Sequence, residues 1–254
     1  MNTLEGKVAI ITGGASGIGE ATARLFAKHG ARAVVIADIQ DEIGKNMSAS
    51  IGTHCCTYIH CDVSDEAQVK SLVDRTVKKY GQLDIMFSNA GIASKSDQTV
   101  VDLDVDQFDR LFAINVRGMA LCLKHSARCM IEKKVKGVII CTASVLARKG
   151  VLRHTDYCMS KHAVVGLMKS ATKQLGPHGI RVNVVSPFAV ATPLMCKVHE
   201  KEAAEVEKIY EQMSSLKDVV LKAEDIAEAV LFLAGRESRF ITGIDMAIDG
   251  GFEV

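Results

Sequence analysis

The 254-residue sequence lacks several features that would point to particular classes of protein. It has no apolar run of about 18 residues, the length that a membrane-spanning helix needs. Its 31 basic and 30 acidic residues give a net charge of +1, so no positive excess favours nucleic acid or an anionic membrane as a partner. No targeting peptide is recognisable before the first apolar run at Lys7. We therefore expect a cytoplasmic protein.

The eight cysteines lack the spacing of a metal site or a redox motif. None forms a Cys-x-x-Cys pair, and no histidine completes a zinc pattern. Several lie inside apolar runs, such as Cys141 after Ile139 and Ile140. We therefore expect buried free thiols, with no disulfide and no metal.

Prolines are scarce, and their positions mark loops. Two of the three, Pro187 and Pro193, flank one segment that we expect to be a loop. Elsewhere apolar runs alternate with helical periodicity, which predicts an α/β fold with a mostly parallel sheet. Most runs lack polar alternation, so both faces of the sheet should be covered. The predicted strands are 7–12, 33–38, 55–60, 83–89, 137–144, 180–186 and 245–249, and the predicted helices are 16–29, 41–50, 66–80, 104–132, 156–176 and 223–233.

The stretch 199–216 is charged and helix-prone, with Val206, Ile209, Tyr210 and Met213 spaced as on one helix face. One interpretation is an amphipathic surface helix. The other is a mobile cover over a pocket, which suits its place after the proline-flanked loop. No repeat or linker divides the chain, so we expect one domain over 1–254 with a substrate-covering segment around 188–216.

The first predicted strand ends in a glycine-rich turn, Thr12-Gly-Gly-Ala-Ser-Gly-Ile-Gly19, and a helix follows. Gly13, Gly17 and Gly19 allow a tight turn and close approach of the backbone to a ligand. Free N–H groups and the positive end of the helix then favour a pyrophosphate. A glycine-rich turn alone is a weak signal, but its place between a strand and a helix strengthens it.

Asp38 ends the second predicted strand, 19 residues after Gly19. This is the position expected for the carboxylate that binds the adenosine ribose of a dinucleotide. Such a carboxylate accepts hydrogen bonds from both ribose hydroxyls and repels a 2′-phosphate. No lysine or arginine occurs at 14–18 or 39–40 to offset that repulsion. We therefore expect NAD rather than NADP as the cofactor.

Motifs in the order found here resemble those of the short-chain dehydrogenase/reductase family, from Lys7 to Gly251. The glycine-rich turn resembles the family's TGxxxGxG pattern rather than GxGxxG, and Asn89-Ala90-Gly91 matches its NAG motif. The resemblance implies a single-domain Rossmann fold with a seven-stranded parallel sheet, helices on both faces, and a homotetramer or homodimer. The family's catalytic tetrad, including its YxxxK pair, is matched by Asn115, Ser144, Tyr157 and Lys161.

Tyr157 and Lys161 are four residues apart, so both project from one face of a helix. A tyrosine titrates near pH ~10, and a nearby ammonium should bring its pKa toward the working range. Ser144, at the end of the fifth strand, can hold the substrate oxygen while Tyr157 removes the proton and hydride passes to the nicotinamide. The resemblance implies that Lys161 also binds the nicotinamide ribose and that Asn115 anchors a water linking Lys161 to solvent.

The resemblance implies further cofactor contacts by the same matching. Asp62 and Val63 should meet the adenine, and Thr192 the nicotinamide carboxamide. The full set expected to bind the cofactor is Gly13, Ser16, Gly17, Ile18, Gly19, Asp38, Ile39, Asp62, Val63, Asn89, Ala90, Gly91, Tyr157, Lys161, Val190 and Thr192.

The chain departs from the family where Pro187-Phe188 replaces the usual Pro-Gly. We expect Phe188 to wall the nicotinamide or the substrate pocket. No arginine clamp for a carboxylate or phosphate is evident, although Arg148 and Arg153 occur nearby, and this favours a small hydrophobic alcohol. The expected substrate residues are Ser144, Val145, Leu152, His154, Tyr157, Phe188 and Met195, with Leu146, Val198 and Tyr210 as further candidates.

Three stretches, 139–144, 155–161 and 175–181, resemble monoterpenol dehydrogenases of plant specialised metabolism, including isopiperitenol and borneol dehydrogenases and the nepetalactol-related enzymes. This implies NAD-dependent oxidation of a cyclic monoterpenoid alcohol or lactol, such as nepetalactol, borneol or isopiperitenol. An alternative is an NAD-bound cyclase without net redox change, as some nepetalactol-related relatives are. A non-catalytic NAD-binding sensor is a third hypothesis, which the intact tetrad disfavours.

Overall fold

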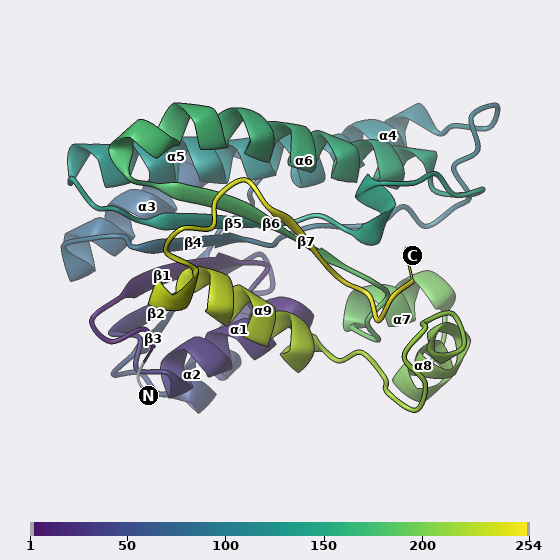
Figure 1. The fold of residues 1–254 in the computed structure, drawn as a ribbon, viewed down its shortest axis with the longest axis horizontal. Coiled ribbons are helices and arrows are strands. Elements are labelled where there is room, and N and C mark those ends of the chain that lie inside the picture. The colour runs from purple at the N-terminus through teal and green to yellow at the C-terminus, as the bar shows by residue number, and fades with distance from the viewer. Residues whose placement is uncertain (1–2, 253–254) are drawn as a thin grey trace.

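Seven parallel strands form one sheet in the computed structural model, which describes residues 3–252 (Figure 1). The strand order is β3-β2-β1-β4-β5-β6-β7, and every neighbouring pair is parallel. The predicted α/β fold with a seven-stranded parallel sheet is therefore confirmed. The strands are β1 (Val8–Thr12), β2 (Ala33–Asp38), β3 (Cys56–His60), β4 (Ile85–Ser88), β5 (Val138–Thr142), β6 (Arg181–Pro187) and β7 (Asp245–Ile248).

Helices cover both faces of the sheet (Figure 1). One face packs against α1 (Gly17–Lys28), α2 (Asp41–Ile51) and α9 (Ala223–Ala234). The other packs against α3 (Glu66–Tyr80), α5 (Met119–Glu132) and α6 (Thr155–Leu175). Two short helices, α7 (Pro193–His199) and α8 (Ala203–Glu211), lie together at one end of the molecule, beside the described end of the chain at Phe252 (Figure 1).

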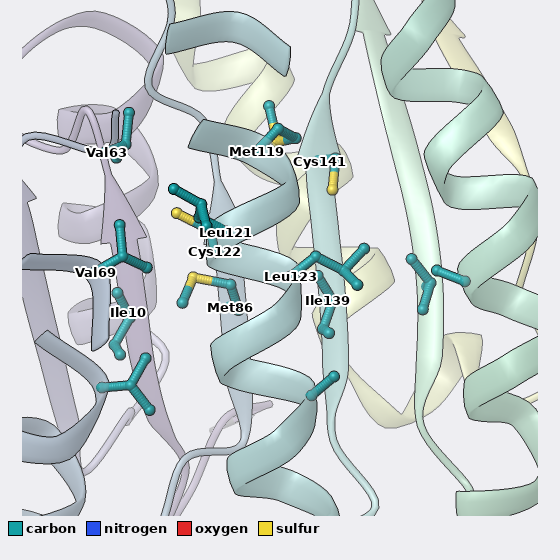
Figure 2. Close-up of a cluster of buried hydrophobic side chains, with 14 of the residues drawn as sticks. Ile10, Val63, Val69, Met86, Met119, Leu121, Cys122, Leu123, Ile139 and Cys141 are labelled. Atoms are coloured by element: carbon teal, nitrogen blue, oxygen red, sulfur yellow. The ribbon is translucent and has the colours of Figure 1, made fainter. Parts of the chain in front are cut away.

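The strands are apolar on both faces because each face has its own core. In β1, Ile10 packs in the cluster under α3, α5 and α6, while Ile11 packs in the cluster under α1 and α9. Figure 2 shows part of the first cluster, where Cys122 of α5 and Met86 of β4 lie together. Six of the eight cysteines are buried, five of them in these two clusters, and all eight are free thiols. Two-sided burial explains why the sequence runs lack polar alternation.

Short polar signals begin and end several helices. Asp65 caps α3 by accepting a hydrogen bond from the Ala67 N–H at 2.8 Å, and Gly81 ends it with φ 82°. Asp104 caps α4 (Val105–Phe112) by accepting from the Gln107 N–H at 3.1 Å. Pro193 lies in the first turn of α7, where its missing N–H costs no helical hydrogen bond. Across residues 3–252, no helix is long and apolar enough to span a membrane.

Two predicted helices differ in the structure. The predicted helix 104–132 is divided into α4 and α5 by a π-helical segment, Ala113–Gly118. Within it, both amide atoms of Asn115 bind the backbone of Ile92, at 2.8 and 2.9 Å, and this tertiary pairing has no periodic signal in the sequence. The predicted helix over 199–216 is shorter, because Glu200 adopts φ 51° and ends α7 before α8 begins.

Two helix-interior glycines provide a test of this packing. A Cβ at Gly44 of α2 would lie 2.2 Å from the Tyr58 ring, and the Tyr58 hydroxyl is held by the Asp38 carbonyl and by Asp41, each at 2.7 Å. A Cβ at Gly166 of α6 would meet nothing within 4 Å. We expect Gly44→Ala to lower the free energy of unfolding by about 1–3 kcal/mol. Gly166→Ala should raise it by about 0.5–1 kcal/mol. Urea denaturation measures both, and equal effects would contradict this account.

Candidate active site

Asn89 joins the carboxyl ends of three central strands. Its Oδ1 accepts a hydrogen bond at 3.0 Å from Oγ1 of Thr142, the last residue of β5. Its Nδ2 donates to the Thr12 carbonyl at 3.2 Å, at the end of β1, and its own N–H donates to Thr12 Oγ1 at 3.0 Å. In parallel α/β sheets ligands bind beyond this edge. These hydrogen bonds therefore fix the floor on which the candidate site is built.

The glycine-rich turn packs closely against this floor. Gly13 and Gly17 have φ values of 62° and 56°, which favour glycine. A Cβ at Gly13 would lie 2.8 Å from Ala90 Cα, and one at Gly17 would lie 3.1 Å from Thr192 Cγ2. At Gly13 and Gly17 the turn therefore presents bare backbone to the cleft at the start of α1, a geometry that suits a pyrophosphate.

Gly19 has a different role from the cofactor contact that the sequence suggested. A Cβ there would lie 2.1 Å from the Gly13 carbonyl oxygen, and Gly19 does not line the cleft. It lets the first turn of α1 pack directly on the loop. Its contribution is to the shape of the turn.

Asp38 is 7% exposed and lies beside the same turn. One carboxylate oxygen accepts a hydrogen bond from the Ala15 N–H at 3.0 Å. The other accepts from the Gln40 N–H at 3.1 Å and from Gln40 Nε2 at 3.3 Å. These bonds orient the carboxylate at the wall of the cleft, where it can meet a ribose.

A continuous cleft of about 780 Å³ follows the carboxyl ends of the strands. Of the residues predicted to bind the cofactor, all but Gly19 line it, and so do the predicted substrate residues except Leu152. Leu152 is 91% exposed and points to solvent, because the neighbouring Val151 takes the place in the wall. The other substrate residues that line the cleft are Ser144, Val145, His154, Tyr157, Phe188 and Met195.

Ser144, Tyr157 and Lys161 meet in the middle of this cleft. Ser144 follows β5, and its Oγ accepts a hydrogen bond from the Leu146 N–H at 3.2 Å. Tyr157 and Lys161 come from one face of α6, and Lys161 Nζ lies 5.3 Å from the centroid of the Tyr157 ring. Lys161 Nζ donates to the Thr142 carbonyl at 3.0 Å. The network of Asn89 therefore extends through Thr142 to the lysine.

Asn115 supports this group without lining the cleft. It is fully buried, and its Nδ2 also donates at 3.3 Å to Oγ of Ser160, which lies about one turn after Tyr157 on α6. A Cβ at Gly91 would lie 3.3 Å from Asn115 Oδ1 and 3.6 Å from Lys161 Nζ. The amide therefore ties the segment after β4 to helix α6, next to the lysine.

Burial dominates the titration of the two helix residues. It raises the pKa of Tyr157 to about 12, although a hydrogen bond with Ser144 lowers it. It lowers the pKa of Lys161 to about 8. We expected the ammonium of Lys161 to bring the pKa of Tyr157 down. In this structure desolvation of the phenolate dominates instead, and the lowering comes from Ser144 rather than from the lysine.

The substrate end of the cleft contains residues that the sequence did not indicate. His199, Met213 and Phe252 line it. Phe252 stacks on Phe188 with ring centroids 4.2 Å apart, and Lys149 Nζ lies 3.2 Å from its ring centroid. Phe252 belongs to no predicted element, so only the tertiary fold brings it here. Met213 does belong to the predicted apolar face of 199–216, which was the one available signal.

Comparison with known proteins points to the family that the sequence motifs resemble. Residues 13–253 match the family model described as enoyl-(acyl carrier protein) reductase. The (−)-isopiperitenol/(−)-carveol dehydrogenase, mitochondrial, of Mentha piperita is 57% identical over 98% of this chain and 94% of that protein. The (+)-cis,trans-nepetalactol synthase of Nepeta racemosa is 56% identical, over 98% of this chain and 91% of that protein. A short-chain dehydrogenase/reductase from Mycobacterium marinum superposes with a TM-score of 0.90 at 33% identity, covering 99% and 97% of the two chains.

The parallel sheet, the glycine-rich turn and the buried Tyr–Lys pair define an α/β oxidoreductase of the nucleotide-binding type. The chain belongs to the short-chain dehydrogenase/reductase family.

The buried lysine gives a prediction about stability. Because the pKa of Lys161 falls from 10.5 to about 8 on folding, the unfolded chain binds more protons between those values. Stability from the neutral amine is therefore present above pH 10.5 and is lost as the pH falls through about 8. Lys161→Met removes this cost, so below pH 8 it should be more stable than the wild type by roughly 3 kcal/mol, at about 1.4 kcal/mol per pKa unit.

Denaturant titrations from pH 7 to about 11 measure the difference between the two proteins. Taking the difference cancels the titration of the buried thiols that do not interact with Lys161, while Cys141, which does, has its pKa raised by burial. Lys169→Met, an exposed change on the same helix, is the matched control and should show no such trend. A stability difference that does not shrink with rising pH would contradict the buried-charge account.

Proposed function

We propose that this protein oxidises a small hydrophobic secondary alcohol or lactol with NAD, and that the substrate is a cyclic monoterpenoid such as nepetalactol, borneol or isopiperitenol. The observation that carries the proposal is the position of Ser144, Tyr157 and Lys161. They lie where a cleft edged by glycines and a carboxylate continues into a pocket edged by apolar side chains. Oxidation of an alcohol requires this junction, because the hydroxyl-bearing carbon must meet the cofactor.

The residues present fit a dinucleotide. The glycine turn at Gly13 and Gly17 has no room for a Cβ toward Ala90 or Thr192, and it opens onto the N-terminus of α1. Asp38 supplies the acceptor for ribose hydroxyls, and its negative charge disfavours the 2′-phosphate of NADP. We therefore propose NAD as the cofactor, bound by the residues that the sequence motifs indicate apart from Gly19, which shapes the turn.

The chemistry assigned to the chain is proton handling. Ser144 and Tyr157, which share a hydrogen bond, hold the substrate hydroxyl between them. Tyr157 accepts the hydroxyl proton once its own phenolic proton has left by way of Lys161 and the cleft, and a bound nicotinamide would supply the acceptor for the hydride. Lys161 is the cation beside the phenol. Because its pKa is lowered to about 8, Lys161 can gain or lose a proton near neutral pH. It can therefore pass a proton between Tyr157 and the solvent of the cleft.

The orientation of Arg148 and Arg153 favours an uncharged substrate. Arg148 Nε donates to Asp245 Oδ2 at 2.8 Å, and Arg153 lies 3.5 Å from Asp97. Both guanidinium groups are thus turned toward carboxylates of the protein rather than serving as a clamp for substrate. The relatives named for monoterpenoid reactions, at 55–57% identity, support the same substrate class.

The other expectations from the sequence stand as proposals of the same kind. We propose one NAD-binding domain over 1–254 in which residues 188–216 cover the substrate, and a homotetramer or homodimer. Cytoplasmic location remains a prediction, and the name of the Mentha piperita relative includes mitochondrial.

A second candidate function is cyclisation of a reactive monoterpenoid enol without net redox change, with NAD bound. Three relatives that are 55–56% identical to this chain are named nepetalactol synthases, almost as similar as the dehydrogenase. The raised pKa of Tyr157 is compatible with this chemistry as well, since a neutral phenol donates a hydrogen bond to a carbonyl oxygen.

A substrate panel distinguishes the two reactions. Nepetalactol, borneol and isopiperitenol are incubated with NAD, and both NADH absorbance and rearranged products are measured. We expect NADH with at least one alcohol. Cyclised product without NADH would favour the cyclase, and NAD binding with neither reaction would favour a sensor.

Tyr157→Phe separates chemistry from binding in this assay. The change removes only the phenolic oxygen, so oxidation should fall below detection while the dissociation constant for NAD stays within about twofold. Calorimetric titration of NAD is the control for folding and binding. NADH formation at the wild-type rate by this variant would refute the proposed proton acceptor.

Asp38 gives a test of cofactor choice. Two like charges near a protein surface repel by about 1–4 kcal/mol at 4 Å, depending on the local dielectric. Asp38→Ala and Asp38→Asn should therefore raise the NADP-to-NAD ratio of kcat/KM by at least about fivefold. The Asn variant keeps an oxygen for the Ala15 N–H, so it isolates charge from loop geometry. An unchanged ratio in both variants would contradict the assignment of Asp38.

A further inference from the structure

Two cavities of the described chain meet at one pair of aromatic rings. The cleft of about 780 Å³ ends at Phe188 and Tyr210, and a second cavity of about 210 Å³ lies beside α8. Phe188, Ala189 and Tyr210 line both cavities. These side chains therefore form a partition between the active-site cleft and the second cavity.

The second cavity is suited to hydrocarbon. Its lining includes Ala191, Val206, Leu216, Val220, Leu221 and Ile248. Two of the acids at this cavity already have partners, since Glu207 pairs with Lys222 Nζ at 2.5 Å and Asp225 accepts from the Lys222 N–H at 2.8 Å. A group entering from the active-site cleft would therefore meet mainly apolar side chains.

The ring of Tyr210 is held in place at two points. Its hydroxyl is hydrogen-bonded to His199 Nε2 at 2.8 Å, which links α8 to α7. Its ring meets Phe188 edge-to-face, with centroids 5.4 Å apart and planes at 89°. Phe188 in turn stacks on Phe252. Because both ends of the side chain are fixed, the partition is a defined wall rather than a loosely packed ring.

We propose that Tyr210 sets the upper size of the substrate by closing the passage between the active-site cleft and the second cavity. The inference rests on the proposed oxidation of a small hydrophobic alcohol at Ser144 and Tyr157. Removal of the ring joins the two cavities and lets the hydrocarbon part of an alcohol extend past α8. Tyr210 is thus a specificity-determining residue, and the second cavity is a latent extension of the substrate site.

A homologous series of alcohols measures this limit. The 4-alkylcyclohexanols from methyl to pentyl present the same secondary hydroxyl on an apolar tail of rising length. In the wild type, kcat/KM should level off or fall for the longer members. In Tyr210→Ala it should continue to rise, because each newly buried methylene contributes up to about fourfold. The pentyl-to-methyl ratio should increase at least about tenfold over the wild type.

Two further variants isolate the ring as the cause. Tyr210→Phe keeps the ring and loses the hydrogen bond to His199, so its length profile should match the wild type. Adding Val220→Phe to Tyr210→Ala refills the second cavity and should restore the wild-type ratio. Tyr210→Val opens the partition with less loss of packing on α8 if the alanine variant unfolds. A pentyl-to-methyl ratio that stays at the wild-type value in both opened variants overturns the proposal.

Binding provides a readout that does not depend on turnover. Calorimetric titration of the same alcohols into the protein with NADH, or into the protein alone, gives affinity against tail length. If no protein oxidises any member of the series, the proposed oxidation fails, while the affinities still decide the role of Tyr210. In whichever assay gives a signal, the variants that open the partition must show a stronger preference for long tails than the wild type.

Discussion

The hydrogen bonds of Asn89 are the constraint on which the rest of the site depends. One amide side chain connects Thr12 at the end of β1 with Thr142 at the end of β5, and the Thr142 carbonyl then accepts from Lys161 Nζ. The glycine turn, the two central strands and the helix that presents Tyr157 are therefore placed relative to one another by one buried polar network. Each partner is satisfied, so the network fixes geometry without leaving an unpaired buried group.

This arrangement buries Tyr157 and Lys161, where the protein interior disfavours their charged forms. The same burial that packs α6 against the sheet raises the pKa of Tyr157 and lowers that of Lys161, so both neutral forms are favoured. At neutral pH the phenol is therefore neutral, while the amine, whose pKa is about 8, is still mostly protonated and loses its proton as the pH rises through that value. Buried ionisable groups with shifted pKa values are common at functional sites. Their burial costs stability, which the apolar cores on the two faces of the sheet offset.

Patterns with a local cause were read correctly from the sequence, and features with a tertiary cause were missed. Strands buried on both faces follow from apolar runs without alternation, as in Val8–Thr12, and the glycine turn follows from its place between a strand and a helix. The π-helical segment at Asn115 was missed because it depends on Ile92, far away in the sequence. Leu152 was misplaced because residues 151 and 152 are adjacent and equally apolar, and the sequence does not say which faces the cleft. Phe252 carried no periodic signal at all.

The relatives of this chain carry two kinds of name, dehydrogenase and synthase, within one family. Dehydrogenase and synthase relatives share nearly the same identity with it over nearly the whole chain. The glycine turn, Asp38 and the Tyr–Lys pair are motif features that either reaction can use, since oxidation and cyclisation both require a bound oxygen and a proton donor or acceptor beside it.

What can differ between the two reactions is the position of the carbon skeleton, because hydride transfer needs one carbon close to the nicotinamide. The residues placed to act on that position lie at the far end of the cleft, where Phe188 replaces the glycine usual in the family and packs between Phe252 and Tyr210. We therefore propose that these rings and segment 188–216, more than the tetrad, decide which of the two proposed reactions the chain carries out.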